Sequence, residues 1–172
     1  MELTGYAPAC AKRSGGIRSV ALADAGAVAG AQYAATDGTY KWVTLTGGVG
    51  FREYRFREDE AAYTESVAFT DGLPLVTHTL SFALERMDAA CREAIEELCA
   101  ATDKGLVAIV TTNAGVSFLV GYSEKFGAAY PLRPARVSGV SGSKPADLSA
   151  EKIVLVSRDT EKAREYTGNI PR

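Results

Sequence analysis

Residues 63–102 of this 172-residue chain read YTESVAFTDGLPLVTHTLSFALERMDAACREAIEELCAAT. The first half alternates with a period of two on either side of Asp71-Gly72, which predicts a long β-hairpin with a tight turn. The second half carries apolar residues at three- and four-residue spacing, which predicts one amphipathic helix over about 88–102. Asp88 is a favourable N-cap for that helix. The hairpin and the helix that follows it decide the expected fold.

The two faces of the predicted hairpin differ in chemistry. One face is mostly apolar and consists of Tyr63, Glu65, Val67, Phe69, Val76, His78, Leu80 and Phe82. The other face is small and hydroxylic and consists of Thr64, Ser66, Thr77, Thr79 and Ser81. The hydroxylic face offers no set of acid, base and nucleophile, so it suits the lining of a channel better than an active site.

The rest of the chain predicts further strands and no second helix. The expected strands are 17–23, 28–34, 40–46, 51–57, 106–112, 116–122, 136–140 and 152–158. Asp37-Gly38 predicts a second tight hairpin turn. We therefore expect a single, mainly β domain over residues 1–172: an antiparallel β-sandwich or barrel with one flanking helix. Residues 1–16 are expected to form an N-terminal arm and residues 159–172 a polar C-terminal tail.

Composition narrows the possible functions. The formal net charge of −2 favours neither a basic DNA-reading surface nor recruitment to an anionic membrane. The apolar runs are strand-sized, far below the roughly 18–20 residues needed to span a bilayer, so membrane insertion is not expected. The N-terminus lacks the basic and apolar segments of a secretory signal, which predicts synthesis in the cytoplasm.

The sequence contains no complete catalytic or metal-binding pattern. The three cysteines form no CxxC pair and stand with a single histidine, His78, so no zinc site is expected. Residues 139–143 resemble the GxSxG elbow of serine hydrolases but lack its second glycine at the required position. No phosphate-binding loop or dinucleotide fingerprint is complete. Cys91 and Cys99 are expected to be structural, while Cys10 has no assigned role. We expect neither enzymatic activity nor a cofactor.

The order of motifs in residues 63–171 resembles that of the tail tube (major tail) proteins of tailed bacteriophages. The similarity rests on THTLSF at 77–82, the helix that follows, GLVAIV at 105–110, SFLVGY at 117–122 and TGNIP at 167–171. The resemblance implies a β-sandwich with a flanking helix and hexameric rings that stack into a hollow tube for genome passage. It also implies a virion tail location, synthesis in the host bacterial cytoplasm, and other tail proteins as partners.

Within that resemblance, specific residues acquire expected roles. Thr64, Ser66, Thr77, Thr79 and Ser81 would face the lumen, where double-stranded DNA passes without sequence readout. Contacts between subunits would involve Glu58, Asp59, Glu60, Lys12 and Arg13. The inner tubes of contractile injection systems and of type VI secretion are similar in fold. The resemblance therefore indicates a tube more specifically than it indicates the assembly to which the tube belongs.

Two other interpretations remain open. The chain is also compatible with a different ring-forming tail component, such as a tail terminator or a baseplate ring. Alternatively, it is a monomeric β-barrel that binds a small ligand in its interior, with His78 and Tyr63 as candidate contacts.

Overall fold

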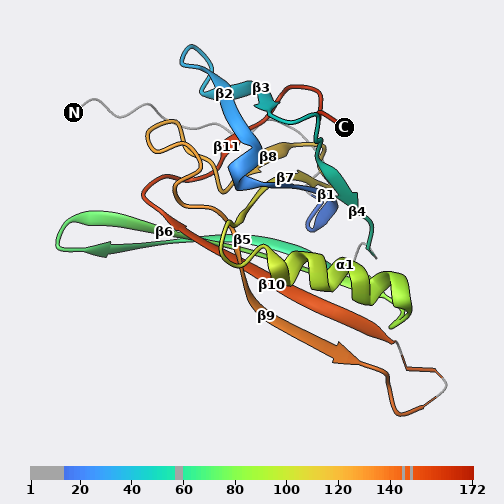
Figure 1. Ribbon diagram of the computed structural model, residues 1–172. Coiled ribbons are helices and arrows are strands. Elements are labelled where there is room, and N and C mark those ends of the chain that lie inside the picture. The colour runs from blue at the N-terminus through green and yellow to red at the C-terminus, as the bar shows by residue number, and fades with distance from the viewer. Residues whose placement is uncertain (1–13, 57–59, 145, 148) are drawn as a thin grey trace.

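The structure of the protein is a computed structural model that describes residues 14–56, 60–144, 146–147 and 149–172. These residues form eleven strands, one short 3-10 helix and one α-helix (Figure 1). The helices are η1 (Ala25–Ala27) and α1 (Ala89–Ala100). The strands are β1 (Ile17–Asp24), β2 (Val28–Ala34), β3 (Thr39–Leu45), β4 (Arg52–Tyr54), β5 (Ala62–Thr70), β6 (Leu73–Glu85), β7 (Leu106–Thr112), β8 (Ser117–Val120), β9 (Arg133–Val140), β10 (Ala150–Asp159) and β11 (Arg164–Glu165).

The strands form three antiparallel sheets. One sheet has the order β11-β8-β7-β1-β4, the second has the order β5-β6-β10-β9, and the third is the β2-β3 hairpin. In Figure 1 the long strands of the four-stranded sheet cross the lower part of the molecule, and α1 lies along them. The predicted mainly β architecture, a sandwich with one helix, is confirmed.

The main hydrophobic core lies between the two larger sheets. Leu80, Phe82, Ile153 and Leu155 of the four-stranded sheet are fully buried in it. The five-stranded sheet contributes Val20, Ala108, Val110 and Val120, and α1 contributes Cys91, Ile95 and Leu98. The apolar stripe of the helix therefore closes one side of the sandwich, because leaving three such side chains in water would oppose folding.

A second core covers the opposite face of the five-stranded sheet. Tyr40 and Val43 of β3 pack there against Val107, Ile109 and Leu119. The β2-β3 hairpin thus forms a third layer. By contrast, no element in the described part of the chain covers the outer face of the four-stranded sheet.

The turn predicted at Asp71-Gly72 and the helix cap predicted at Asp88 are confirmed by backbone geometry. Asp71 and Gly72 have φ angles of 51° and 80°, the left-handed values that a two-residue hairpin turn requires. The Asp88 side chain accepts a hydrogen bond from the Cys91 amide at 2.9 Å and caps α1. At the other predicted turn, Gly38 has a positive φ of 71° but Asp37 does not, and β2 and β3 are joined by the four-residue loop 35–38 rather than by a two-residue turn.

Several element boundaries differ from those expected. β4 has only three residues because it pairs at the sheet edge with 20–22 of β1 alone. β9 begins at Arg133 rather than at 136 and includes Pro134, which is tolerated because β9 is an edge strand. The segment 159–172, expected as a polar tail, packs on the body: β11 pairs with β8, and Tyr166 is buried in the second core.

Candidate functional site

The outer face of the four-stranded sheet carries all five hydroxylic residues predicted from the sequence. In the β5-β6 ladder Thr64 is directly opposite Thr79, and Ser66 is opposite Thr77. Ser81 lies on the same side, opposite Ala62. The neighbouring residues of β6 with the opposite parity, such as His78 and Leu80, are buried. The predicted division of the hairpin into two faces is therefore confirmed, and we call these five residues the hydroxyl patch.

A cationic patch, absent from the predicted site residues, continues the same face across β9 and β10. It consists of Arg133, Arg136, Lys152 and Arg158, all exposed. Arg158 of β10 is directly opposite Thr77 of β6. Two residues earlier on β10, Val156 pairs with Thr79 of β6 on one side and with Arg133 of β9 on the other. The outer face thus changes from hydroxylic on β5 and β6 to positively charged on β9 and β10.

A β-bulge explains why Arg133 and Arg136 share one face. Residues three apart point to opposite sides of a regular strand. Here Arg136 pairs with Val154 and Arg133 with Val156, so the register shift leaves Ala135 as the extra residue. The bulge turns both guanidinium groups toward the outer face.

The acidic side chains on β10 point into the protein, away from the cationic patch. Glu151 and Asp159 are 6% and 5% exposed, respectively, and each adjoins a cation of the patch, Lys152 or Arg158. Strand alternation therefore places the negative charges inside and the positive charges outside. Among the described residues, no ion pair involves any of the four patch cations.

One end of the cationic patch is hollowed. A cavity of about 360 Å³ is lined by residues of the 129–135 segment and of β10, including Arg133, Val156 and Arg158. Tyr130, 41% exposed, lies on its wall, and the Ser157 hydroxyl fixes that wall by donating a hydrogen bond of 2.6 Å to the Tyr130 carbonyl oxygen. Two guanidinium groups thus flank a concave site large enough for a phosphate group.

The end of the β5-β6 hairpin projects beyond the sandwich, as Figure 1 shows at the left. Phe69 and Leu73 are 75% and 72% exposed, and Val67 and Leu75 are also exposed. We call residues 67–75 the hairpin tip. Exposed apolar side chains of this size at the end of a projecting hairpin are typical of a protein-protein contact.

A buried polar cluster ties the base of this hairpin to the C-terminal segment. The Tyr63 hydroxyl donates to Oε1 of Glu65 at 2.7 Å and lies 2.9 Å from Nδ1 of His78. Nε2 of His78 lies 3.0 Å from the carbonyl oxygen of Glu161, to which it can only donate. The Ala163 amide donates to Glu65 at 2.9 Å.

The cluster strongly favours the ionised form of Glu65. Burial by itself raises the pKa of this carboxyl, but the hydrogen bonds from His78, Tyr63 and the backbone outweigh burial and lower the pKa to about 2. Burial raises the pKa of Tyr63, and the Glu65 carboxylate raises it further. Both ring nitrogens of His78 are engaged by protein groups, so the cluster is built to hold structure rather than to contact a ligand.

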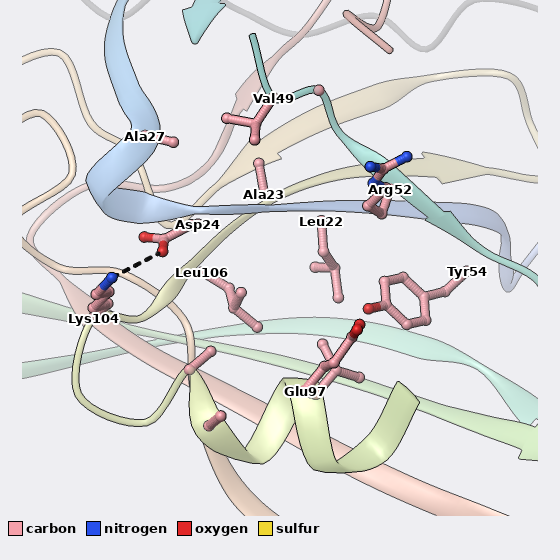
Figure 2. A pocket seen from close by; sticks show the side chains of 14 residues that line it. Leu22, Ala23, Asp24, Ala27, Val49, Arg52, Tyr54, Glu97, Lys104 and Leu106 are labelled. Carbon is pink, nitrogen blue, oxygen red and sulfur yellow. Dashed lines mark ion pairs between the residues drawn. The ribbon is translucent and has the colours of Figure 1, made fainter. Parts of the chain in front are cut away.

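A hollow of about 440 Å³ lies between α1, β1 and β4. Figure 2 shows Leu22 and Leu106 pointing into it, with Arg52, Tyr54 and Glu97 around its rim. Lys104 and Asp24 form an ion pair of 3.8 Å at one end (Figure 2). Neither His78 nor Tyr63 lines this hollow, so the two residues expected to contact a small ligand do not converge on it.

The residues predicted to contact neighbouring subunits are largely outside the described part of the chain. Glu58, Asp59, Lys12 and Arg13 lie there, whereas Glu60 is described and half-buried. Cys91 is buried in the main core and Cys99 is exposed, both with free thiols.

The described residues contain no group of three or more His, Cys, Asp or Glu side chains that could hold a metal ion. No helix in that same part of the chain is long and apolar enough to cross a bilayer. No protein-family model matches the sequence, and no curated protein matches it either.

Proposed function

We propose that the protein is a structural subunit of a ring, and that rings of this subunit stack into a hollow tube through which double-stranded DNA passes, as in phage tails. The observation that carries this proposal is the four-stranded sheet, whose outer face is uncovered and whose two edge strands have no further partner among the described residues. β5 and β9 are those edges, and exposed edges of this length favour pairing with another chain.

The strand directions suit a ring. Three successive antiparallel pairings make β5 and β9 run in opposite directions. Placing β9 of one copy beside β5 of the next therefore continues the same antiparallel pattern, and the contact is head to tail, which closes into a ring when the rotation allows. Pro134 and the bulge at Ala135 restrict this pairing to residues 136–140 of β9.

The expected channel has a suitable width. Six copies, the number implied by the resemblance to tail tube proteins, would form a barrel with four strands from each copy. With a spacing of about 4.8 Å between strands and the tilt usual for barrels, its interior is on the order of 30 Å across after side chains are allowed for. Such an opening is wider than a DNA duplex, and the hydroxyl patch would line it.

The hairpin tip supplies a second contact between copies. It lies beyond the sandwich, and its apolar side chains have no cover within the described part of the chain. We propose that the tip packs on the adjacent ring, which would make the rings stack. A terminator or baseplate ring would use the same sheet edges but would stop at a single ring, so the length of the assembly distinguishes these functions.

The test is light scattering and negative-stain electron microscopy of the purified protein over a range of concentration and salt. Rings or tubes with a central channel are expected. A matched pair of variants tests the sheet edge: Val140→Lys at the end of β9 and Val49→Lys in a loop, at positions 61% and 52% exposed. The Val140 variant should remain monomeric while the Val49 variant assembles. A wild-type protein that stays monomeric under all conditions, even with an added tail initiator complex, would contradict the proposal.

A further inference from the structure

The outer face of the four-stranded sheet has the chemistry of a surface that binds the phosphate backbone of DNA. We infer that the cationic patch contacts the phosphates of a DNA duplex, with the hollow between Arg133 and Arg158 as its strongest anion site. The identification of the polyanion as duplex DNA rests on the proposed function, whereas the anion-binding surface is present in a single chain.

Charge is distributed unevenly between the two faces of this sheet. The chain carries a net charge of −2, yet the four patch cations lie together on one face while the nearby acids, Glu151 and Asp159, are buried on the other side of β10. Glu85, exposed at the far end of β6, is the acid that shares the outer face in the described strands of this sheet. A local positive field on a weakly negative protein selects an anionic partner.

The four patch cations are spread along the strands rather than gathered at one point. Lys152 and Arg158 are six residues apart on one strand, which separates them by roughly 20 Å. Arg136 and Arg133 lie on the neighbouring strand between those limits, so the patch is an extended band rather than a point. DNA carries a phosphate charge every ~1.7 Å along its axis, so a band of this length meets several phosphates whatever the base sequence.

The remaining side chains of the face select a duplex. Recognition of single strands depends on aromatic side chains on which bases stack. The outer-facing positions of the four described strands hold no aromatic residue, and Tyr130 lies only at the border of the hollow. Threonine and serine hydroxyls beside the cations donate hydrogen bonds to phosphate oxygens without reading bases. These contacts hold a duplex loosely and let it slide.

The hydroxyl patch by itself carries no charge that would attract DNA, whereas the complete outer face attracts phosphates along β9 and β10. Attraction that depends on salt and not on sequence is compatible with passage, because such contacts form and break as the duplex moves.

The experiment measures binding of a short, fluorescently labelled DNA duplex by anisotropy between about 50 and 200 mM salt. The double variant Arg133→Gln, Arg158→Gln should bind at least about tenfold more weakly, and its slope of log affinity against log salt should shrink by about two. The control, Arg18→Gln with Lys125→Gln, removes the same charge from exposed positions outside this sheet and should bind like the wild type. Circular dichroism and thermal melting confirm that each variant is folded.

The conservative variant Arg133→Lys, Arg158→Lys should retain most of the binding and the full salt slope. Equal losses in the Gln variant and the control would overturn the inference, as would binding to vesicles of anionic lipid in place of DNA. Electron microscopy of the same samples separates the two proposals. Rings without DNA binding would refute this inference alone, and DNA binding by protein that never assembles would refute the proposed ring alone.

Discussion

Glu65 on β5 and His78 on β6 are directly opposite each other, and Oε1 of Glu65 lies 3.4 Å from Nδ1 of His78. Tyr63 bridges the two side chains from the same face of the sheet, while the backbone at 161–163 completes the cluster. The cluster therefore joins the long hairpin to the segment that leads to β11. Because it sits just below the exposed hairpin tip, it determines how firmly the projecting part of the hairpin is held.

Replacing Glu65 by glutamine should reduce the acid sensitivity of the fold. The pKa of Glu65 is about 2 in the folded protein against an ordinary value of 4.5, so the unfolded chain binds this proton first as the pH falls. The stabilisation from this group is complete above pH ~4.5 and is lost between pH ~4.5 and ~2, by about 1–3 kcal/mol. Urea unfolding at a series of pH values measures it.

The Glu65→Gln variant should be less stable than the wild type near neutral pH but should lose less stability across that acid window. Glu93→Gln, at an exposed position on α1, is the control and should follow the wild-type curve. Parallel pH profiles for the wild type and Glu65→Gln would show that Glu65 is not held in its ionised form by the cluster.

Removing the helix cap should weaken α1 by a defined amount. Asp88 accepts the Cys91 amide hydrogen, so Asp88→Ala leaves that donor without a protein partner and should lower the free energy of unfolding by about 1 kcal/mol. Asp88→Asn should cost only a few tenths, since asparagine caps nearly as well. Asp103→Ala, an exposed aspartate just past the helix, serves as the control in the same denaturant titration. An equal loss in all three variants would contradict a capping role.

The local parts of this fold could be predicted from the sequence, and the long-range parts could not. Alternation and Asp71-Gly72 specify the β5-β6 hairpin because its partners are neighbours in the chain. The five-stranded sheet joins β1 to both β4 and β7, and no local pattern encodes which distant strands meet. Likewise, Tyr166 lies in a mostly polar segment with no alternating apolar residues to reveal that β11 docks beside it.

The candidate surface was predictable only in part for a related reason. The hydroxyl patch follows from a regular period of two, so its five members could be assigned to one face. The cationic patch depends on the bulge at Ala135, since Arg133 and Arg136 would point to opposite sides of a regular strand. On β10, the exposed positions of Lys152 and Arg158 were available from alternation once the acids beside them were recognised as inward-facing.

Shortening the apolar side chains of the hairpin tip should impair assembly without affecting the fold. Phe69 and Leu73 are mostly exposed, so the double variant Phe69→Ser, Leu73→Ser should change the free energy of unfolding by no more than about 0.5 kcal/mol per site. Its tubes should be shorter or absent in electron micrographs. The control is Trp42→Ser, which removes a half-exposed aromatic side chain from β3. Tubes of normal length in the tip variant would rule out a role for the tip in stacking.

Adding positive charge to the hydroxyl patch should strengthen DNA binding at a cost in stability. In the double variant Thr77→Lys, Thr79→Lys, the first lysine lies directly opposite Arg158. The second lies opposite Val156, whose partner on the other side is Arg133. Like charges in opposed positions destabilise a sheet by roughly 0.2–1 kcal/mol, and phosphate would relieve this repulsion. The variant should therefore fold, bind the duplex more tightly, and show a salt slope steeper by about two. In a tube, the same change should slow DNA passage.

The matched control for that variant is Thr36→Lys with Thr44→Lys, which places two lysines at exposed positions of the β2-β3 hairpin on the far side of the molecule. Both double variants carry the same net charge, so a general attraction between protein and DNA would raise the affinity of each equally. A gain confined to the Thr77 and Thr79 variant, together with a higher melting temperature when the duplex is added, would assign the effect to the outer face, because there the new charges join the four cations of the patch.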